Sequence, residues 1–289
     1  MANVLKRDFG GVRRNDKFTI IPIGDVHIGA AGCDEDLLAE TVEFIRTTRN
    51  AYWIGMGDYI DAINYTDPRF DPRTLAPWIT VQNMSDLAGA QLERFLEIIT
   101  PIAKKCLCML TGNHEDTIKK YYERDIYSEI VSRLKIAAGF PQDHQLKLDY
   151  YGWLRLSFHS KEEPEAGPGI RTTAIDFNLH HGFGGGKLAG SKALQMEKWL
   201  WTHGAEVTIF GHTHNADAFR AAVEYLDLHG NVKIEERRGV YSGTYLTNYN
   251  GSGSTYAERK GYFPIGVGGV MIELHPHAHK RSDMIRVIT

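Results

Sequence analysis

The sequence predicts an α/β fold organised around parallel strands, and three observations support this. Four apolar runs each end in glycine and then in an acid, amide or histidine. Residues 34–50 lie between the first two runs and carry apolar side chains at helical spacing, with Asp34 placed to cap the helix. A strand, a helix and a second strand in this order form a β-α-β unit, in which the two strands are parallel. The four polar strand ends are Gly24-Asp25-Val26-His27, Gly57-Asp58, Gly112-Asn113-His114-Glu115 and Gly211-His212-Thr213-His214.

The other elements follow from hydrophobic spacing along the chain. Residues 1–16 are polar and basic and predict a loose or edge segment before a buried strand that begins at Phe18. Residues 62–84 contain two Asp-Pro turns and predict a loop or short cap. Helices are expected at 85–104 (capped by Ser85), 121–134 and 187–203. Strands are expected at 52–56, 106–110, 173–180, 207–210, 219–228, 232–236, 239–246, 268–274 and 284–288, with a β-hairpin over 146–158 that turns at Tyr151-Gly152.

Composition is that of an ordinary globular protein. The chain has 289 residues, of which 43% are hydrophobic and 24% charged, and its formal net charge is -3. A charge so near neutrality argues against a broad electrostatic grip on nucleic acid. No apolar run approaches the roughly 20 residues that a membrane span needs, and no signal-peptide pattern opens the chain. Three cysteines without disulfide spacing suit a reducing compartment, so we expect a cytoplasmic protein with no membrane partner.

Asp25 and His27 are two positions apart, so their side chains leave the same side of an extended chain. A single D-x-H of this kind is more often part of a glycine-rich turn than of a metal site. Acid, amide and histidine residues recur at the other strand ends, however, and these side chains are common metal ligands. The recurrence therefore favours a metal centre.

Five motifs, taken in order, resemble those of the calcineurin-like metallophosphoesterase superfamily over about residues 18–246. They are G-Asp25-x-His27, G-Asp58-x-x-Asp61, G-Asn113-His114-Glu115, His181-Gly182 and G-His212-x-His214. The resemblance implies a four-layer α/β/β/α sandwich with two mixed β-sheets. It also implies a single domain over residues 1–289, with the core at about 18–246, a loop or cap insertion at about 62–84 and a C-terminal β extension at 247–289.

The chemistry of such a site needs two divalent metals. Set roughly 3.5 to 4 Å apart, they hold a hydroxide between them and clamp the oxygens of a phosphate during in-line attack. One ligand must touch both metals, and Asp58, a carboxylate at a strand end, suits that bridge. Manganese is favoured, and iron, zinc, nickel, cobalt and magnesium are the other candidates. The resemblance adds three ligands to each metal: Asp25, His27 and His214 for one, and Asn113, His181 and His212 for the other.

By the same resemblance His114 is a catalytic residue alongside Asp58. It protonates the leaving oxygen or steadies the transition state. Glu115 and Asp116 are the candidates to orient its imidazole. Asp61 has ligand spacing, but the family pattern makes it a supporting acid that fixes the loop.

Several residues admit a second interpretation. His180 and His181 compete for one ligand position, and the glycine that follows favours His181. Cys106 and Cys108 are spaced like half a metal site, yet they lie in an apolar run and fit a core strand better. The tyrosines of 121–127 fit helix packing better than base stacking. The alternating histidines at 275, 277 and 279 have no acid or cysteine beside them and fit a solvated edge strand better than a third metal site.

Two positions bear on the substrate. The Ser/Thr phosphoprotein phosphatases of the superfamily carry an arginine directly after the second Asp of G-D-x-x-D and another directly before G-N-H-E, where this chain has Ala62 and Thr111. Loss of two bidentate clamps favours a phosphodiester, with its single formal charge, over a phosphomonoester dianion. The prediction is a binuclear metal-dependent phosphodiesterase that acts on nucleotide or nucleic-acid diester bonds through the metal-bridging hydroxide.

Two other functions stay open as alternatives. One is a phosphomonoesterase for small molecules or Ser/Thr phosphoproteins. The other is a non-catalytic scaffold, which is less favoured because no ligand is missing. Residues 242–262 also resemble uncharacterised phosphoesterases of phage and prophage origin. Candidate substrate contacts for a nucleotide or a single-stranded nucleic acid are Asn113, His114, Tyr245 and Arg259, although the Gly-Ser-rich stretch around Arg259 also fits a plain surface loop. The sequence leaves the oligomeric state open.

Overall fold

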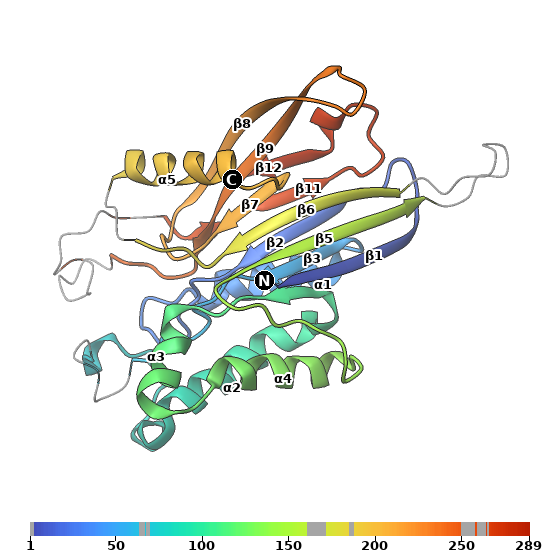
Figure 1. The fold of residues 1–289 in the computed structure, drawn as a ribbon. Helices are drawn as coiled ribbons and strands as arrows, with labels where there is room; N and C mark the ends of the chain where they lie inside the picture. The colour runs from blue at the N-terminus through green and yellow to red at the C-terminus, as the bar shows by residue number, and fades with distance from the viewer. Residues whose placement is uncertain are drawn as a thin grey trace.

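The computed structural model describes residues 3–63, 67, 70–160, 172–184, 188–249, 258, 264 and 266–289. Two mixed β-sheets pack face to face, with helix α5 (Ala189–Thr202) on one outer side and helices α1 to α4 on the other (Figure 1). This four-layer α/β/β/α arrangement confirms the predicted fold class.

The first sheet has seven strands and carries α5 on its outer face. Its order is β1-β5-β6-β7-β9-β10, and β8 pairs with β9 beside that path. The β6, β7 and β9 strands are parallel to one another, and β8 is antiparallel to β9. The strands are β1 (Val4–Val12), β5 (Tyr151–Ser160), β6 (Thr172–His180), β7 (Val207–Phe210), β8 (Ala216–Leu226), β9 (Val232–Thr244) and β10 (Gly268–Gly269).

The second sheet has five strands in the order β12-β11-β2-β3-β4. Its parallel part, β2-β3-β4, continues the β-α-β unit predicted from the sequence. The antiparallel part comes from the C-terminal region, where β11 pairs directly with β2. The strands are β2 (Phe18–Ile23), β3 (Ala51–Gly55), β4 (Cys106–Met109), β11 (Met271–Leu274) and β12 (Ile285–Ile288).

Four helices cover the free face of the five-stranded sheet: α1 (Glu35–Thr47), α2 (Leu87–Ile99), α3 (Asn113–Tyr122) and α4 (Ile126–Ala138). Asp34 caps α1 as predicted, because its side chain accepts a hydrogen bond from the backbone N–H of Leu37. Short 3-10 turns lie at Pro72–Thr74, Val81–Asp86, Thr100–Lys105 and Arg281–Asp283.

Three apolar clusters hold the layers together. One lies between the five-stranded sheet and the helices, and Trp53 and Phe95 are fully buried in it. The second fills the space between the two sheets, where Phe158 stacks on Phe9 with ring centroids 5.1 Å apart. The third is small and joins α5 to β7 and β9. Because the clusters lie on both faces of each sheet, the central strands are apolar on both sides, as their continuous hydrophobic runs predict.

Several sequence-based boundaries differ from the structure. The stretch 146–158 is not a hairpin: β5 is one strand between β1 and β6, and Gly152 lies within it. The helix expected at 121–134 is two helices, which are separated where Glu123 adopts a left-handed conformation with φ 56°. The two strands expected between 232 and 246 are a single strand, β9. In each case sheet pairing or a local turn outweighs the hydrophobic spacing on which the prediction rested.

The structure also bears on the alternative interpretations of the two cysteines in β4 and of the histidines near the C-terminus. Cys106 and Cys108 are buried in β4, in agreement with a core strand. The histidines at 275–279 follow β11, and the clusters of potential metal ligands among the described residues do not include them. His277 is itself buried, so this segment is not the solvated edge strand that we expected.

Within the described part of the chain, no helix combines the length and apolarity that a membrane crossing requires.

The start of α2 gives a test of the local structure. Its cap is Asp86, whose Oδ1 accepts the N–H of Gly89 at 2.9 Å, and not Ser85 as the sequence suggested. We expect Asp86→Ala to lower the free energy of unfolding by about 1 kcal/mol, because a helix N–H loses its acceptor. Urea denaturation measures this. Ser85→Ala is the matched control and is expected to change stability by less than about 0.5 kcal/mol.

Asp86 also pairs with Arg124, so a second variant is needed to separate the two roles. Asp86→Asn keeps the cap and removes the charge. It should therefore behave like the wild type, since exposed ion pairs contribute little. A loss in Asp86→Asn equal to that in Asp86→Ala would contradict the capping role.

Candidate metal centre

Five strand ends meet at one edge of the sandwich. The strands β2, β3 and β4 of one sheet and β6 and β7 of the other all end there, and each is followed by polar side chains. The carboxyl ends of parallel strands are the usual place for binding sites in α/β folds. The side chains that meet are Asp25, His27, Asp58, Asp61, Asn113, His114, His181, His212 and His214, in agreement with the convergence expected from the sequence.

The turns that carry these residues have an unusual backbone. Seven described non-glycine residues have positive φ, and five of them belong to the site: Asp25, His27, Asp58, His212 and His214. A left-handed conformation is unfavourable for residues with a Cβ, and such residues cluster where surrounding structure fixes them for function. The strained turns aim the side chains inward immediately after each strand ends.

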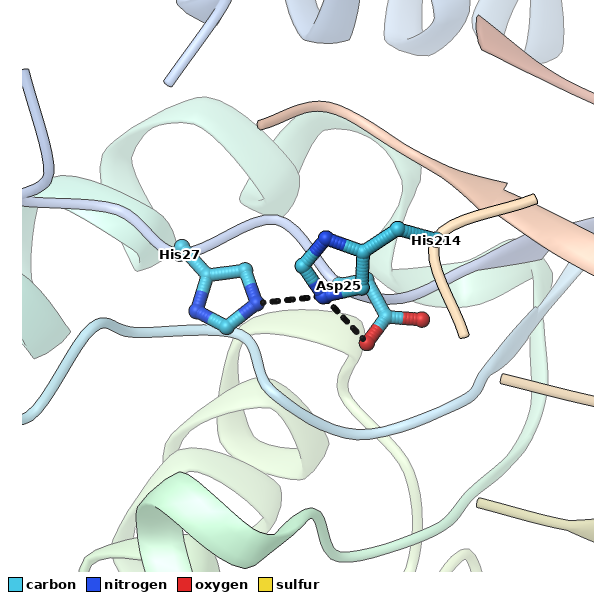
Figure 2. Close-up of side chains that lie close together, drawn as sticks. All are labelled: Asp25, His27 and His214. Carbon is cyan, nitrogen blue, oxygen red and sulfur yellow. Dashed lines mark hydrogen bonds and ion pairs between the residues drawn. The ribbon is translucent and has the colours of Figure 1, made fainter. Parts of the chain in front are cut away.

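One group of ligand atoms comes from Asp25, His27 and His214 (Figure 2). The Nε2 atoms of His27 and His214 lie 3.2 Å apart, and Nε2 of His214 lies 3.4 Å from Oδ1 of Asp25. The other carboxylate oxygen, Oδ2, accepts the backbone N–H of His212 at 2.8 Å. Asp25 Oδ1 is fully buried yet accepts no hydrogen bond, so its position fits a cation ligand.

A second group comes from Asp58, His181 and His212. Nε2 of His181 lies 3.5 Å from Oδ2 of Asp58 and 3.1 Å from Oδ1 of Asn113, so the amide also belongs to this group. The carbonyl oxygen of Met56 accepts a hydrogen bond from Nδ1 of His181 at 2.7 Å. Because a carbonyl can only accept, Nδ1 carries the hydrogen, and the Nε2 lone pair faces the site.

The Asp58 carboxylate lies between the two groups. Its Oδ2 is 3.5 Å from Nε2 of His181 on one side and 4.0 Å from Nε2 of His27 on the other. Its Oδ1 is held by the backbone N–H of His114 at 2.9 Å. The single oxygen Oδ2 thus faces both groups. Gly112 permits this approach, since a Cβ at that position would lie 2.1 Å from Asp58 Oδ1.

Glu115 does not have the partners expected from the sequence. Instead of orienting His114, its buried carboxylate accepts backbone N–H groups from the loop after β3 and from the turn before α3. The donors are Asp58 (3.0 Å), Tyr59 (2.7 Å), Ile60 (3.3 Å) and Gly112 (3.0 Å). Glu115 therefore ties together the two loops that position Asp58 and His114.

Asp61 is the acid that lies near His114. Nδ1 of His114 donates to the backbone carbonyl of Asp61, and Oδ1 of Asp61 lies 3.9 Å from the same nitrogen. The same carboxylate oxygen lies 3.8 Å from Nδ1 of His27. With Nδ1 engaged by a carbonyl, Nε2 is the atom through which His114 can exchange a proton. Asp61 is predicted to support its loop. Its carboxylate also lies beside the imidazole of His114.

Burial and mutual proximity set the charge of the site. Burial lowers the pKa of His27 well below its usual value and lowers that of His214 to about 4, so both imidazoles are neutral near pH 7. Burial also acts on His181, but Asp58 and Asp25 outweigh it and raise the pKa of His181 to about 10. Burial raises the pKa of Asp25 to about 8. A divalent cation favours ionised carboxylates and neutral imidazoles, so it would replace the proton that these residues otherwise share.

The adjacent His180 lies outside the site. Its ring packs edge-on against Trp199 at 5.3 Å and against Phe183 at 5.2 Å, and its Nδ1 accepts the backbone N–H of Gly182. His181 is thus the one of the two histidines that reaches the other candidate ligands, as the preceding sequence argument favoured.

Two candidate substrate contacts, Tyr245 and Arg259, come from the C-terminal part of the chain. Tyr245 is 3% exposed, packs in the core and lies 3.3 Å from the Thr41 hydroxyl through its own hydroxyl. A ring in that position offers no open face to a base; its backbone N–H instead donates to the carbonyl of Asp25 and supports the first turn. Arg259 lies outside the described residues.

The sequence profile of the calcineurin-like phosphoesterase family matches residues 18–216, which is more than half of the chain. The chain belongs to this family. Its members hydrolyse phosphoric esters, and this phosphoesterase has the groups of potential ligands that divalent metals require. No curated protein matches the chain.

Two solved structures with low sequence identity to this phosphoesterase are among those that match the chain. A conserved uncharacterized protein from Streptococcus pneumoniae TIGR4, described as a predicted phosphoesterase, is 11% identical over 94% of this chain and 98% of its own, with a TM-score of 0.33. The NAD nucleotidase of Haemophilus influenzae is 10% identical over 96% of this chain, with a TM-score of 0.38. This second match spans half of the nucleotidase chain. The family assignment rests on the sequence profile.

The role of Glu115 in this phosphoesterase gives a second prediction. Glu115→Ala removes the acceptor of four backbone N–H groups and leaves them buried, so we expect a loss of about 2–4 kcal/mol in the free energy of unfolding, measured in urea. Asp116→Ala is the matched control, because Asp116 is the exposed neighbour on the same helix. It should change stability by less than about 0.5 kcal/mol. Equal effects of the two substitutions would refute the proposed role of Glu115.

Proposed function

We propose that the protein is a binuclear metal-dependent phosphodiesterase that acts on nucleotide or nucleic-acid diester bonds, with residues 1–289 as one catalytic domain. The observation that carries this proposal is the position of Asp58 Oδ2 between two groups of ligand atoms. Asp25, His27 and His214 would hold one metal together with Asp58, and Asn113, His181 and His212 would hold the other together with Asp58.

The bound metals supply a water molecule of lowered pKa and neutralise charge on the phosphate oxygens. The chain contributes position and proton transfer. Asp58 is fixed by the N–H of His114, so the bridging ligand and the catalytic imidazole keep one mutual geometry. His114, with Nδ1 engaged by the carbonyl of Asp61, delivers a proton from Nε2 to the leaving oxygen.

A diester substrate is supported by the groups near the site. The ion pairs of Asp25 and Asp58 within the described residues are all with histidines, and no lysine or arginine is among them. Ala62 is buried and its N–H donates to Gln91, so the position directly after Asp61 offers no cation. A phosphomonoester dianion would lack the guanidinium partners that its second charge favours.

A nucleotide as part of the substrate is supported by Phe183. This residue follows the proposed ligand His181 by two positions, and as a whole it is 47% exposed. Gln195 holds its backbone carbonyl at 3.2 Å, and its ring packs on His180. An anchored aromatic ring with an open face can stack on a base. Sequence reasoning missed Phe183 because it lies between a glycine and the loop before α5, where hydrophobic spacing carries no signal.

Metal stoichiometry tests the ligand assignment. We expect about two manganese ions per chain by elemental analysis after reconstitution. His181→Ala should lower this to about one, because a ligand of the second metal is lost. His180→Ala is the neighbouring control and should keep both ions, since that ring lies in the aromatic cluster outside the site. Loss of an ion in His180→Ala but not in His181→Ala would reverse the assignment.

Paired substrates test the ester class. The protein should hydrolyse bis-(p-nitrophenyl) phosphate with a kcat/KM about tenfold or more above that for p-nitrophenyl phosphate, since among the described residues Asp25 and Asp58 pair only with histidines and position 62 carries no cation. Chelation should abolish both activities and added Mn²⁺ should restore them. A monoester preference would favour the phosphomonoesterase alternative, and absence of both activities in the metal-loaded protein would favour a non-catalytic scaffold.

A further inference from the structure

Strand β8 is an edge strand with an open side. It has 11 residues, Ala216–Leu226, and pairs with β9 along its whole length, from Ala216 opposite Ser242 to Leu226 opposite Val232. In Figure 1 it is the outermost strand of its sheet, and the β8-β9 hairpin extends past the other strands. Among the described residues, no segment other than β9 makes a backbone hydrogen bond to β8. One row of its N–H and C=O groups is therefore available for a further strand.

Most of the usual protections of an edge strand are lacking in β8. Natural edge strands are kept apart by short length, bulges, proline or charged side chains, and of these β8 has only charged side chains, at Asp217, Arg220 and Glu224. The sequence of β8, ADAFRAAVEYL, contains no proline, glycine or lysine, and its pairing with β9 runs without a register shift. A long, regular and uncovered edge of this kind favours pairing with another strand.

Two charged residues of β8 have no ion-pair partner within the described chain. Arg220 and Glu224 are exposed, four positions apart and on the same face of the strand. Opposite Arg220 on β9 is Arg238, which is paired with Glu236, so the surroundings of Arg220 favour an additional carboxylate. Opposite Glu224 is Ile234, which supplies no cation.

We propose that β8 pairs antiparallel with β8 of a second copy of this chain, about a two-fold axis at Ala222. In this register Arg220 of each copy lies opposite Glu224 of the other, which forms two ion pairs. Phe219 lies opposite Tyr225, and Ala218 lies opposite Leu226. Cross-strand pairs of opposite charge and of two aromatic rings are both favourable in antiparallel sheets. A two-fold interface has to be self-complementary in this way.

Neighbouring registers do not place Arg220 of one copy opposite Glu224 of the other. An axis at Ala221 places Arg220 opposite Ala222, and an axis at Val223 places it opposite Leu226. An axis at Arg220 or Glu224 places like charges against each other, which is unfavourable. The axis at Ala222 also places a small side chain where the two copies approach most closely. The charge pattern therefore specifies one register.

The exposed apolar residues of the hairpin support the same partner. Leu226 is 66% exposed, Leu228 is fully exposed, and Val232 and Ile234 on β9 are exposed as well. A ribbon of two strands is only marginally stable in water. In the proposed dimer the ribbons of both copies join one continuous sheet, and Leu226 packs on Ala218 of the second copy. The contact uses no residue of the metal centre. A result that contradicts the dimer therefore does not contradict the proposed function, and the reverse also holds.

Charge reversal tests the interface. We expect the wild-type chain to be a dimer by sedimentation velocity at about 10–100 µM. Arg220→Glu should weaken dimerisation about tenfold or more because it creates two like-charged pairs, and Glu224→Arg should do the same. The double variant Arg220→Glu with Glu224→Arg restores both pairs in reversed order and should return the dissociation constant to within about threefold of the wild type. Lys104→Glu, an exposed reversal on the opposite layer, is the control for net charge and should leave the dimer unchanged.

Cross-linking tests the register. Opposed residues in antiparallel pairs have Cα atoms about 4.5–5.5 Å apart, which a disulfide spans. Ala222→Cys should therefore give a covalent dimer on oxidation, seen in a non-reducing gel, while Ala218→Cys and the wild type should not. A wild-type chain that stays monomeric over this range would overturn the proposal. So would a dimer that Arg220→Glu leaves intact, or one in which Ala222→Cys fails to cross-link.

Discussion

The geometry of the metal centre depends on the hydrogen bonds that the Glu115 carboxylate accepts from two loops. Three of its N–H donors belong to the segment after β3 and one belongs to the turn before α3. Hydrogen bonds to a buried carboxylate are strong and directional. They fix the Asp58 segment relative to the start of α3, and only then can Asp58 Oδ1 accept the N–H of His114. Thus Glu115, a residue outside both groups of potential ligands, determines where Oδ2 of Asp58 lies.

The site combines this rigidity with backbone strain. Left-handed conformations cost of order 1 kcal/mol for a residue with a Cβ, and five residues of the site adopt them. The strands beneath can support such turns because their residues are buried on both faces by the apolar clusters. The same strands therefore stabilise the core and fix the position at which each strained turn begins. Relaxing a turn would move its ligand away from the shared centre.

The sequence predicts the convergence of the site well because each ligand sits at a chemically marked boundary. Asp25, Asp58 and His212 each follow an apolar run and a glycine, and parallel strands bring such ends to one edge. Most partners of Glu115 were not predictable, since three of the four are backbone groups of a loop about 55 residues away. The burial of Tyr245 was also missed, because a tyrosine in a glycine-rich stretch carries no sign of the core against which it packs.

The fold shows the same division between local and distant information. Helix α1 and its cap follow from neighbours in the chain, and both were predicted. The continuity of β5 and of β9 depends on pairing with distant strands, and local patterns gave an incorrect hairpin and an incorrect break. The C-terminal strands were expected as an extension beyond a core that ends near residue 246. They instead complete the five-stranded sheet, because Ile272 of β11 lies opposite Ile20 of β2.

That pairing has a consequence for how the chain is made. The strand β2 carries the first two polar residues of the site at its end. Among the described strands, its partner on one side is β11, some 250 residues later in the chain. During synthesis on the ribosome, the edge of β2 that pairs with β11 therefore lacks this partner until residues 271–274 have emerged. Contacts so far apart in sequence form slowly. A chain truncated before Met271 would lack the strand that pairs with β2 beside the first turn of the site.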